Sequence, residues 1–429
     1  MEIKNLIKKI TPLFLLDFYH YLLPQVGAFL YGFPSRRIIV IGVTGTNGKS
    51  TVVDLAARIF EEAGYKVASL SSIKFKIRNR EWSNTLKMTM PGRFKLQKFL
   101  RQALDADCQY VVLEVTSEGI KQHRHRFIDF NTAVLTNLTP EHIEAHGSFE
   151  KYKETKGELF RAAKKIHILN LDDENKKYFL SFPADKKYGY GLNSGYQPHG
   201  IEYLKAENIQ ATPKGIGFSV KDISFNLPLL GSFNIYNAIA AICVGLSQGI
   251  SLETSKSALE KLKVIPGRME EVISEPFKVF VDYAFTPNAL QKAYETLSEN
   301  SKFQIPNSKM VCVLGACGGG RDKWKRPVLG ELAAKYCDEV IITNEDPYDE
   351  DPMEIINQIA EGAEGKAKTI LDRREAIKKA LLLAEPGDTV VITGKGCEPC
   401  ICAAKGKKIP WDDREVVKEE LEHITHYVL

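Results

Sequence analysis

The sequence predicts an α/β protein built from mostly parallel strands and amphipathic helices. An apolar run at 38–41 leads through a glycine-rich loop into a helical pattern, strand-like and helical runs alternate up to about residue 170, and a second such series follows residue 266. We therefore expect three parts: an N-terminal helical arm at 1–37, a central domain at 38–265 and a C-terminal domain at 266–429.

The central domain is expected to hold a mostly parallel sheet with helices on both faces. Short apolar runs predict strands at 37–43, 110–115 and 132–138. Apolar residues recurring every three or four positions predict helices at 50–64, 93–104, 148–163 and 234–249. Residues 187–230 are richer in Gly, Pro and alternating apolar positions, which indicates a small β-rich appendage.

The C-terminal domain is expected to be a Rossmann-like α/β unit. It begins where Pro266 and Gly267 interrupt the pattern. Its strands are predicted within 277–284, 309–320, 338–346 and 388–396. Its helices are predicted at 326–336, 352–363 and 374–384.

Composition excludes a disordered or fibrous chain and gives no sign of a nucleic-acid partner. The 429 residues are 44% hydrophobic and 26% charged, and the net charge is only +4 without a lysine-rich tract. The eight cysteines, without a secretory signal, indicate a reducing cytoplasm. The triplet in CEPCIC lacks a second half of ligands, so we predict no zinc site.

The N-terminal arm allows two interpretations. The stretch KNLIKKI places apolar residues on one helical face, and an apolar run follows at 13–32. Asp17, His20, Pro24 and Gln25 interrupt that run, so we do not expect a membrane-spanning helix. We favour a helix packed on the central domain over a peripheral membrane anchor that would lie in the lipid interface.

The loop at 42–51 predicts a nucleotide-binding site. Glycines recur at every third position ahead of Lys49 and Ser50, whereas the generic phosphate-loop pattern would need glycine in place of Val43. Such a loop presents backbone N–H groups and a helix N-terminus to phosphate, with the lysine near the β- and γ-phosphates and the serine placed for Mg²⁺. The alternative is a tight turn with an incidental lysine.

The stretch GVTGTNGKST resembles the ATP loop of the Mur ligase superfamily, the ATP-dependent amide-bond-forming enzymes that include muramyl peptide ligases and folylpolyglutamate synthases. Other stretches resemble the superfamily in the same order: EVTSEGIKQHR, TNLTPEHIEAHGSFEKYKETKGELF, GSFNIYNAIAA, PGRME, VDYAFTPNAL, GGGRDKWKRP, NEDPYDEDP, GKGCE and KKIPWDDREV. Together they most resemble the MurE group, which adds the third residue of the peptidoglycan stem peptide to UDP-N-acetylmuramoyl-L-Ala-D-Glu.

The resemblance implies a cytoplasmic, ADP-forming ligase that joins an amino acid to the carboxylate of a muramyl peptide in peptidoglycan precursor synthesis, expected as a monomer. The implied ATP-binding residues are Gly45, Thr46, Asn47, Gly48, Lys49, Ser50, Thr51, Asn234, Asn237, Arg268 and Asp282. The two asparagines are otherwise explained as caps at the start of an apolar helix.

The resemblance also implies ATP-bound Mg²⁺ at two sites. Ser50 and Glu114 would be ligands of one ion and His142 of the second, and Lys49, Glu114, His142 and Lys156 would be catalytic. Taken alone, a carboxylate at a strand end such as Glu114 equally well caps the next helix. His142 alone would more often be a surface residue, and the nearby histidine at position 146 is a rival.

Lys156 is similar to the lysine that members of this family carry as a carbamate. A buried lysine with a lowered pKa can react as a neutral amine with CO₂ and become an anionic group that supports the second metal. The sequence by itself favours a solvated helix face for this residue.

Two substrate sites follow from the resemblance. Residues matching positions near the nucleotide-sugar peptide are Thr116, Ser117, Gln122 and Arg124. Residues matching the acceptor amino-acid pocket are Arg321, which would bind a carboxylate, and Asp346, Tyr348 and Glu398.

Four positions depart from the family pattern. Tyr348 stands where diaminopimelate-adding members have an arginine that clamps the distal carboxylate, and Phe285, Cys397 and Glu118 stand in place of histidines. Five carboxylates surround the tyrosine: Glu345, Asp346, Asp349, Glu350 and Asp351. We therefore expect a basic acceptor such as L-lysine or L-ornithine, although a solvated loop that caps the next helix would also explain the acidic residues.

Only about forty residues precede the loop, whereas MurE members carry a front domain that holds the UDP group, so we expect that module to be absent. The alternatives are a folylpolyglutamate-synthase-like ligase, a P-loop kinase or ATPase of another class, and an ATP-binding module for a partner enzyme. The stretches GRME, RDKWKRP and DDREV argue against the first of these.

Overall fold

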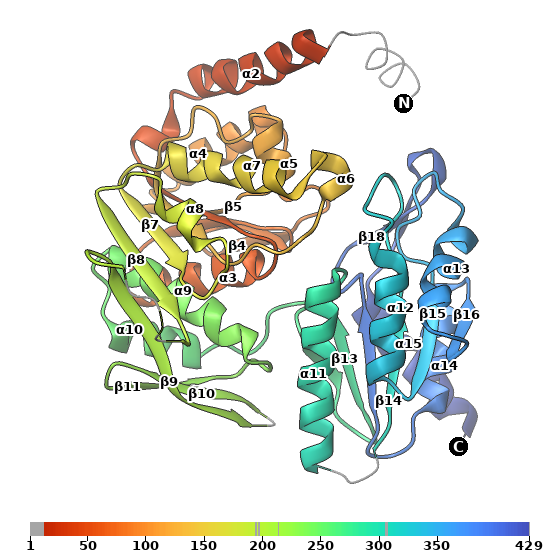
Figure 1. Ribbon diagram of the computed structural model, residues 1–429. Helices are drawn as coiled ribbons and strands as arrows, with labels where there is room; N and C mark the ends of the chain where they lie inside the picture. The colour runs from red at the N-terminus through yellow and green to blue at the C-terminus, as the bar shows by residue number, and fades with distance from the viewer. Residues whose placement is uncertain (1–12, 194, 196–197, 213, 305–307, 429) are drawn as a thin grey trace. The chain divides into compact units, whose positions relative to one another are not determined.

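A computed structural model describes residues 13–193, 195, 198–212, 214–304 and 308–428 (Figure 1). The chain divides into two compact units, which we describe separately. The first unit holds residues up to 140, 146–228 and 232–263, and the second holds 141–145, 229–231 and 264–429. The stretch KNLIKKI lies outside the described residues.

An eleven-stranded sheet forms the centre of the first unit, in the order β11-β10-β9-β8-β7-β6-β1-β5-β2-β3-β4. Its strands are β1 (Ile39–Thr44), β2 (Val67–Leu70), β3 (Lys74–Ile77), β4 (Arg80–Ser83), β5 (Tyr110–Glu114), β6 (Phe130–Leu135), β7 (Ile166–Asn170), β8 (Lys186–Gly191), β9 (Glu202–Thr212), β10 (Gly215–Val220) and β11 (Ile223–Leu227). The run from β2 to β9 through the middle of the sheet is parallel, as the alternating pattern predicts.

The two edges of this sheet are antiparallel. At one edge, β9, β10 and β11 form the β-rich segment that the sequence predicts, and β8 joins it to the main sheet through parallel pairing. At the other edge, β2, β3 and β4 pair antiparallel, which the sequence analysis did not predict.

Helices cover both faces of the sheet (Figure 1). The helices of the first unit are α2 (Leu13–Leu30), the 3₁₀ turn η1 (Pro34–Arg36), α3 (Lys49–Glu62), α4 (Arg93–Asp105), α5 (Ser117–Lys121), α7 (Phe149–Ala162), α8 (Lys176–Leu180), α9 (Phe233–Ser247) and α10 (Leu252–Glu260). The short helix α6 (Ile143–His146) spans the division between the units, since residues 141–145 are assigned to the second. Helices α3 and α9 pack together on one face, while apolar residues of α4, α7 and α8 share a buried core with strands on the other. Helix α2 packs on the outside of α4.

The second unit is built on a six-stranded sheet in the order β12-β13-β17-β14-β15-β16. Its strands are β12 (Glu270–Ile273), β13 (Lys278–Asp282), β14 (Met310–Leu314), β15 (Glu339–Thr343), β16 (Ala367–Ile370) and β17 (Thr389–Thr393), with a separate hairpin of β18 (Cys400–Cys402) and β19 (Lys408–Pro410). Only β12 is antiparallel to its neighbour in the large sheet.

Helices also cover both faces of the second sheet. They are α11 (Pro287–Gln304), α12 (Lys325–Tyr336), α13 (Pro352–Gly362), α14 (Arg373–Leu383), η2 (Ala404–Gly406) and α15 (Asp413–Val428). Helices α11, α12 and α13 pack in a row, and α14 and α15 contribute to the apolar core on the sheet. The α/β fold class is therefore confirmed for both units. No described helix is long and apolar enough to cross a membrane.

Candidate active site

The phosphate loop connects β1 to α3, and its glycines are required by close contacts. Gly45 has φ 146° and Gly48 has φ 81°, which are left-handed backbone conformations that favour glycine. A Cβ atom on Gly45 would lie 1.9 Å from Thr136 Oγ1, and one on Gly48 would lie 2.2 Å from Asn237 Oδ1. The loop can therefore turn into the helix only with glycine at these two positions.

Hydrogen bonds from a neighbouring loop hold the phosphate loop in place. Thr46 Oγ1 donates to the carbonyl of Thr139 at 3.1 Å, and the amide of Asn47 donates to Asn137 Oδ1 at 3.0 Å. Lys49 Nζ donates to the carbonyl of Thr46 at 2.7 Å, so the lysine folds back over the loop from the first turn of α3. This arrangement gathers a helix N-terminus, loop amides and an ammonium group, which together suit a polyphosphate.

Ser50 and Glu114 lie next to each other, as the resemblance requires for a shared Mg²⁺ site. Ser50 Oγ donates to Glu114 Oε2 at 2.7 Å, and the amide of Ser72 donates to the same oxygen at 2.8 Å. Thr116, not Glu114, caps the next helix α5, so the capping explanation for Glu114 is wrong. A hydroxyl and a carboxylate oxygen beside a phosphate loop fit Mg²⁺, which prefers oxygen ligands and takes further ones from phosphate and water.

Lys156 lies in the interior, which corrects the expectation of a solvated helix face. Its side chain is 1% exposed, and Nζ donates to the carbonyl of Gly45 at 2.7 Å in the phosphate loop. Nζ also lies 4.6 Å from the centre of the Tyr152 ring. Burial is the main cause that lowers the pKa of Lys156 well below its ordinary value, the charge of Lys49 lowers it further, and Glu114 opposes the shift.

The two candidate histidines belong to different compact units. His142 has φ 56° and lies in the segment 141–145 of the second unit. Its rival His146 lies in the first unit, is buried, and packs edge-on against Tyr152 with ring centres 5.3 Å apart. The role of His142 as a ligand of a second Mg²⁺ remains a prediction. Among the described residues, no three His, Cys, Asp or Glu side chains form a metal-binding group.

The asparagines expected near adenine lie in the first turns of α9. Asn237 Nδ2 donates to Asn234 Oδ1 at 2.9 Å, and both side chains are buried. Ser232 occupies the N-cap position, so neither asparagine is the cap residue. Thr51 is buried in the first turn of α3. Their roles toward ATP remain predictions.

The residues expected near the muramyl peptide gather around α5. Ser117 is buried, Gln122 ends the helix, and Arg124 donates to Gln122 Oε1 at 2.7 Å and to the carbonyl of Met90. Burial, followed by the charge of Arg93, lowers the pKa of Arg124.

Arg93, which the sequence analysis missed, brings a second guanidinium to this region. It occupies the first position of α4, and the helix dipole disfavours a cation at that end. An arginine at the first position of a helix is unusual, and this feature of the sequence could have marked Arg93 as a candidate site residue.

In the second unit, Arg321 lies in the glycine-rich loop between β14 and α12. No described carboxylate forms an ion pair with it, and its expected role in binding the carboxylate of the acceptor remains a prediction. Tyr348 has φ 53°, and its ring lies so close to Gly319 that a Cβ there would be 2.7 Å from it. The loop glycine and the tyrosine thus pack together beside the candidate acceptor arginine.

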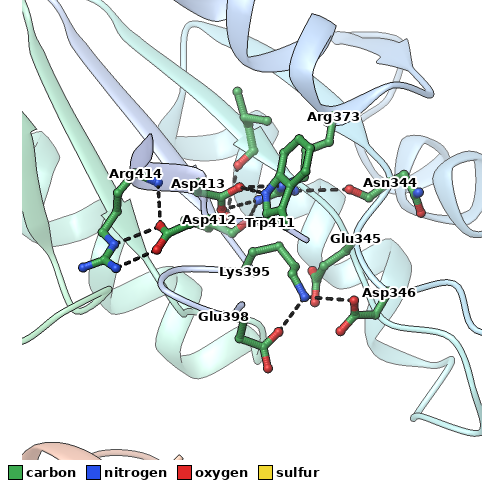
Figure 2. Close-up of polar contacts among 12 residues, drawn as sticks. Asn344, Glu345, Asp346, Arg373, Lys395, Glu398, Trp411, Asp412, Asp413 and Arg414 are labelled. Carbon is green, nitrogen blue, oxygen red and sulfur yellow. Dashed lines mark hydrogen bonds and ion pairs between the residues drawn. The ribbon is translucent and has the colours of Figure 1, made fainter. Parts of the chain in front are cut away.

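Asp346 and Glu398, expected in the acceptor pocket, share one buried lysine (Figure 2). Lys395 is fully buried, and its Nζ donates to Asp346 Oδ1 at 2.8 Å, to Glu398 Oε2 at 2.6 Å and to the carbonyl of Cys400 at 2.8 Å. Burial lowers the pKa of Lys395, but the carboxylates outweigh it and the pKa is raised well above its ordinary value. Lys395 lies in the stretch GKGCE, whose spacing alone does not indicate that this lysine pairs with two carboxylates.

Most of the acidic residues around Tyr348 accept hydrogen bonds from other groups of the second unit. Glu350 accepts from buried Arg326 at 2.9 Å, Asp349 accepts from the amide of Lys405, and Asp351 caps α13. Cys317 donates to Glu345 Oε1 at 2.9 Å, while Glu345 Oε2 is buried without a hydrogen-bond partner among the described residues. Burial, followed by Asp346, raises the pKa of Glu345.

Arg268 and Asp282 lie close together in the second unit. Arg268 stacks over the Tyr283 ring at 4.5 Å, and Asp282 Oδ2 accepts from the amide of Met269 at 2.7 Å. Burial raises the pKa of Asp282, and Arg268 opposes the shift. Their expected contacts with ATP remain predictions.

The stretch DDREV is anchored by a buried ion pair. Arg373 Nη2 lies 2.7 Å from Asp413 Oδ2, and the Trp411 indole donates to Asp413 Oδ1 at 2.8 Å (Figure 2). These contacts of Asp413 therefore fix the start of α15.

Two of the positions that depart from the family pattern make contacts of their own. Lys325 Nζ lies 5.1 Å from the ring centre of Phe285 and pairs with Glu141 at 2.7 Å, and all three belong to the second unit. Cys397 Sγ donates to the carbonyl of Pro266 at 3.3 Å. Phe285 and Cys397 therefore each make a defined contact with a neighbouring residue of the second unit.

Comparison with known proteins places the chain in a family. Residues 43–245 match the Mur ligase middle domain, and residues 267–396 match the Mur ligase, glutamate ligase domain. A UDP-N-acetylmuramoyl-L-alanyl-D-glutamate–2,6-diaminopimelate ligase of Syntrophomonas wolfei is 37% identical over 93% of this chain and 81% of its own length. A UDP-N-acetylmuramyl-tripeptide synthetase of a Roseiflexus species is 35% identical over 94% and 82%.

Solved structures agree with this placement. The structure of a UDP-N-acetylmuramoyl-L-alanyl-D-glutamate–2,6-diaminopimelate ligase aligns with a TM-score of 0.60 at 29% identity, covering 91% of this chain and 79% of that one. A Mycobacterium tuberculosis folylpolyglutamate synthase aligns with a TM-score of 0.71 at 18% identity over 87% and 92%, a likeness of fold alone. The chain therefore belongs to the Mur ligase family of ATP-dependent amide ligases, and it is similar to MurE-type members.

Proposed function

We propose that this protein joins an amino acid to the free carboxylate of a muramyl peptide of the UDP-N-acetylmuramoyl-L-Ala-D-Glu type, through an acyl phosphate formed with ATP. The observation that carries the proposal is Lys156, a buried lysine hydrogen-bonded to the phosphate loop. A kinase or simple ATPase has no need of such a group, whereas a ligase must stabilise several anionic oxygens while a carboxylate attacks the γ-phosphate.

Separate groups of the chain would bind the phosphates, the Mg²⁺ ion and the acceptor amino acid. Lys49 and the loop amides bind the phosphates, and Ser50 and Glu114 would hold one Mg²⁺, which neutralises phosphate charge when bound. The substrate carboxylate displaces ADP from the γ-phosphate, and the acceptor amine then displaces phosphate from the acyl carbon and loses a proton. Arg321 binds the carboxylate of the acceptor and so orients its amine.

Lys156 would carry a carbamate. As a neutral amine it can attack the carbon of CO₂, so that an N–C bond forms and a proton leaves to solvent. The resulting anion would support the second Mg²⁺, for which His142 remains the proposed protein ligand.

Product analysis tests the proposal against the kinase and the folylpolyglutamate-synthase alternatives. We expect ADP and phosphate only when a muramyl dipeptide and an amino acid are both present, together with a product whose mass equals their sum less water. Lys49→Ala should abolish turnover because the phosphates lose their positioned cation. ADP formation with a phosphorylated acceptor, or product only with a folate and glutamate, would contradict the proposal.

The acceptor is proposed to be a basic amino acid such as L-lysine or L-ornithine. Tyr348 stands where the diaminopimelate-adding pattern has an arginine, and the tyrosine offers no charge to a distal carboxylate. Fewer carboxylates than the sequence suggested are available to attract a distal ammonium group. Asp346 and Glu350 are paired with Lys395 and Arg326, and of the five carboxylates near Tyr348 only Glu345 is buried without a cationic hydrogen-bond partner among the described residues.

The ratio of kcat/KM for L-lysine and meso-diaminopimelate on one muramyl peptide decides the acceptor. We expect L-lysine to be preferred, and Tyr348→Arg to shift the ratio toward diaminopimelate. A native preference for diaminopimelate would contradict this assignment while leaving the ligase chemistry intact, and it would point to Arg321 or Lys323 as the clamp.

A further inference from the structure

Helix α2 exposes an apolar face that the proposed ligase reaction does not use. Six large apolar side chains in twelve residues are exposed, with Phe29 at 73% and Leu30 at 65%. The others are Tyr19, Tyr21, Leu22 and Val26. At 100° per residue these six spread over about half of the helix circumference, with Tyr21 at the packed border and the exposed Gln25 between Tyr21 and Phe29.

The opposite side of α2 fixes the helix to the first unit. Pro24, Gly27 and Ala28 are buried, and Gly27 lies against Phe94 of α4, where a Cβ would contact its backbone at 3.6 Å. Tyr21 adds an edge-on contact with Phe127, with ring centres 5.5 Å apart. The described part of the predicted arm, α2, is therefore packed on α4 (Figure 1). The exposed side chains lie largely on the side of the helix that this packing leaves uncovered.

Two exposed arginines follow α2 in the chain, while Asp17 precedes Tyr19 within the helix and Asp129 pairs with Arg36. Residues 18–37 contain no Asp or Glu, and Arg36 and Arg37 follow the helix in exposed positions. Arg36 is 64% exposed at its side chain and stacks over the Phe33 ring at 4.3 Å, with Asp129 at 3.7 Å. An aromatic and aliphatic face that is followed in the chain by two exposed arginines is complementary to an anionic lipid surface, where rings lie at the headgroup level and cations meet phosphates.

We propose that the α2 face, defined as Tyr19, Tyr21, Leu22, Val26, Phe29 and Leu30, binds the protein peripherally to an anionic membrane. A second copy of the chain fits less well, because a symmetric contact through this face would bring the exposed Arg36 and Arg37 of both copies close together, whereas an anionic surface attracts them. The helix is also not apolar enough to span a bilayer, so it lies in the interface.

Sedimentation with lipid vesicles tests the proposal. The full chain should sediment with vesicles of phosphatidylcholine mixed with phosphatidylglycerol and much less with phosphatidylcholine alone. Phe29→Ser combined with Leu30→Ser should lower the partition coefficient roughly tenfold or more, because two exposed apolar anchors are lost. Arg36→Gln with Arg37→Gln should lower binding to the anionic vesicles by about tenfold and leave the neutral ones unchanged.

A matched control separates this surface from general stickiness. Leu371 and Leu382 are exposed at 47% and 53% in the second unit, and replacing both by serine should leave vesicle binding unchanged. ATP turnover in solution should be native in all these variants, so the result does not depend on the proposed function. Absence of binding to anionic vesicles, unchanged binding after the α2 substitutions, or a dimer that those substitutions dissociate without any vesicle binding would each overturn the proposal.

Discussion

Lys156 in the first unit and Lys395 in the second are equally excluded from water. Their hydrogen-bond partners differ in charge, because Lys156 donates to a neutral carbonyl and Lys395 to two carboxylates. Lys156 donates to one backbone carbonyl, at Gly45, and has Lys49 as a neighbouring charge. Lys395 donates to two carboxylates, Asp346 and Glu398. Burial favours the neutral amine in both cases, and only the carboxylates of the second site reverse that preference.

The difference teaches that burial alone does not decide the role of a lysine. A buried ammonium between carboxylates is a structural cation whose removal leaves uncompensated charge. A buried amine with a lowered pKa is more readily neutral, which is the state that the proposed reaction of Lys156 with CO₂ requires. Removing either lysine should therefore have a different effect on stability and on ligation.

The largest effect is expected for Lys395→Met. Removing the cation leaves Asp346 and Glu398 facing each other in the interior, which should lower the free energy of unfolding by about 3–5 kcal/mol. Denaturant unfolding of the native and variant proteins measures it. Combining the change with Asp346→Asn and Glu398→Gln should restore part of the lost free energy of unfolding. A single variant as stable as the native protein would contradict the assignment of Lys395 as a structural cation.

Lys156→Met should have a large effect on ligation and a small effect on the free energy of unfolding. Ligation should fall by roughly a hundredfold to a thousandfold, as when one positioned electrostatic group is lost from an active site. The free energy of unfolding should stay within about 1 kcal/mol of native, since a buried amine without a carboxylate partner is removed. Nucleotide affinity, measured by ADP titration, should persist because the phosphate loop is intact. Loss of folding, or native ligation, would contradict the contrast.

The two lysines should also differ in how stability depends on pH, in buffer depleted of CO₂. The pKa of Lys156 is lowered from 10.5 on folding, so between the folded and unfolded pKa values the unfolded chain binds more protons. Stability of the native protein relative to Lys156→Met should therefore rise with pH from the folded pKa up to the unfolded value of 10.5.

For Lys395 the sign is opposite and the window lies higher. Its pKa is raised above 10.5 on folding, so its contribution is fully present below that value and is lost only as the pH rises through the folded pKa. The stability difference between native protein and Lys395→Met should thus be flat from about pH 7 to about pH 10. Equal slopes for the two lysines would contradict the assignment of their partners.

The sequence predicts well what depends on local spacing. The glycines at 45 and 48 and the following Lys49 predict a strand, a tight loop and a helix start, and the structure has all three. Periodicity likewise predicts α9 and α14 nearly to their ends, because amphipathic and apolar helices carry their burial pattern in the sequence itself.

What the sequence could not give depends on contacts between distant residues. Lys156 looks like one lysine among several on a helix, and only the approach of Gly45, 111 positions away, shows that it is buried. Lys395 reaches Asp346, 49 positions away, by the same kind of long-range contact. The antiparallel pairing of β3 with β2 was missed because short strands of mixed polarity carry little periodic signal.

The most direct test of the account is whether CO₂ adds to Lys156 and not to Lys395. The native protein would be equilibrated with ¹³C-bicarbonate and examined by ¹³C NMR, beside Lys156→Met and Lys395→Met. We predict one carbamate resonance in the native protein, its absence from Lys156→Met, and its presence in Lys395→Met wherever that variant remains folded. No carbamate resonance in the native protein, or one that persists in Lys156→Met, would contradict the account.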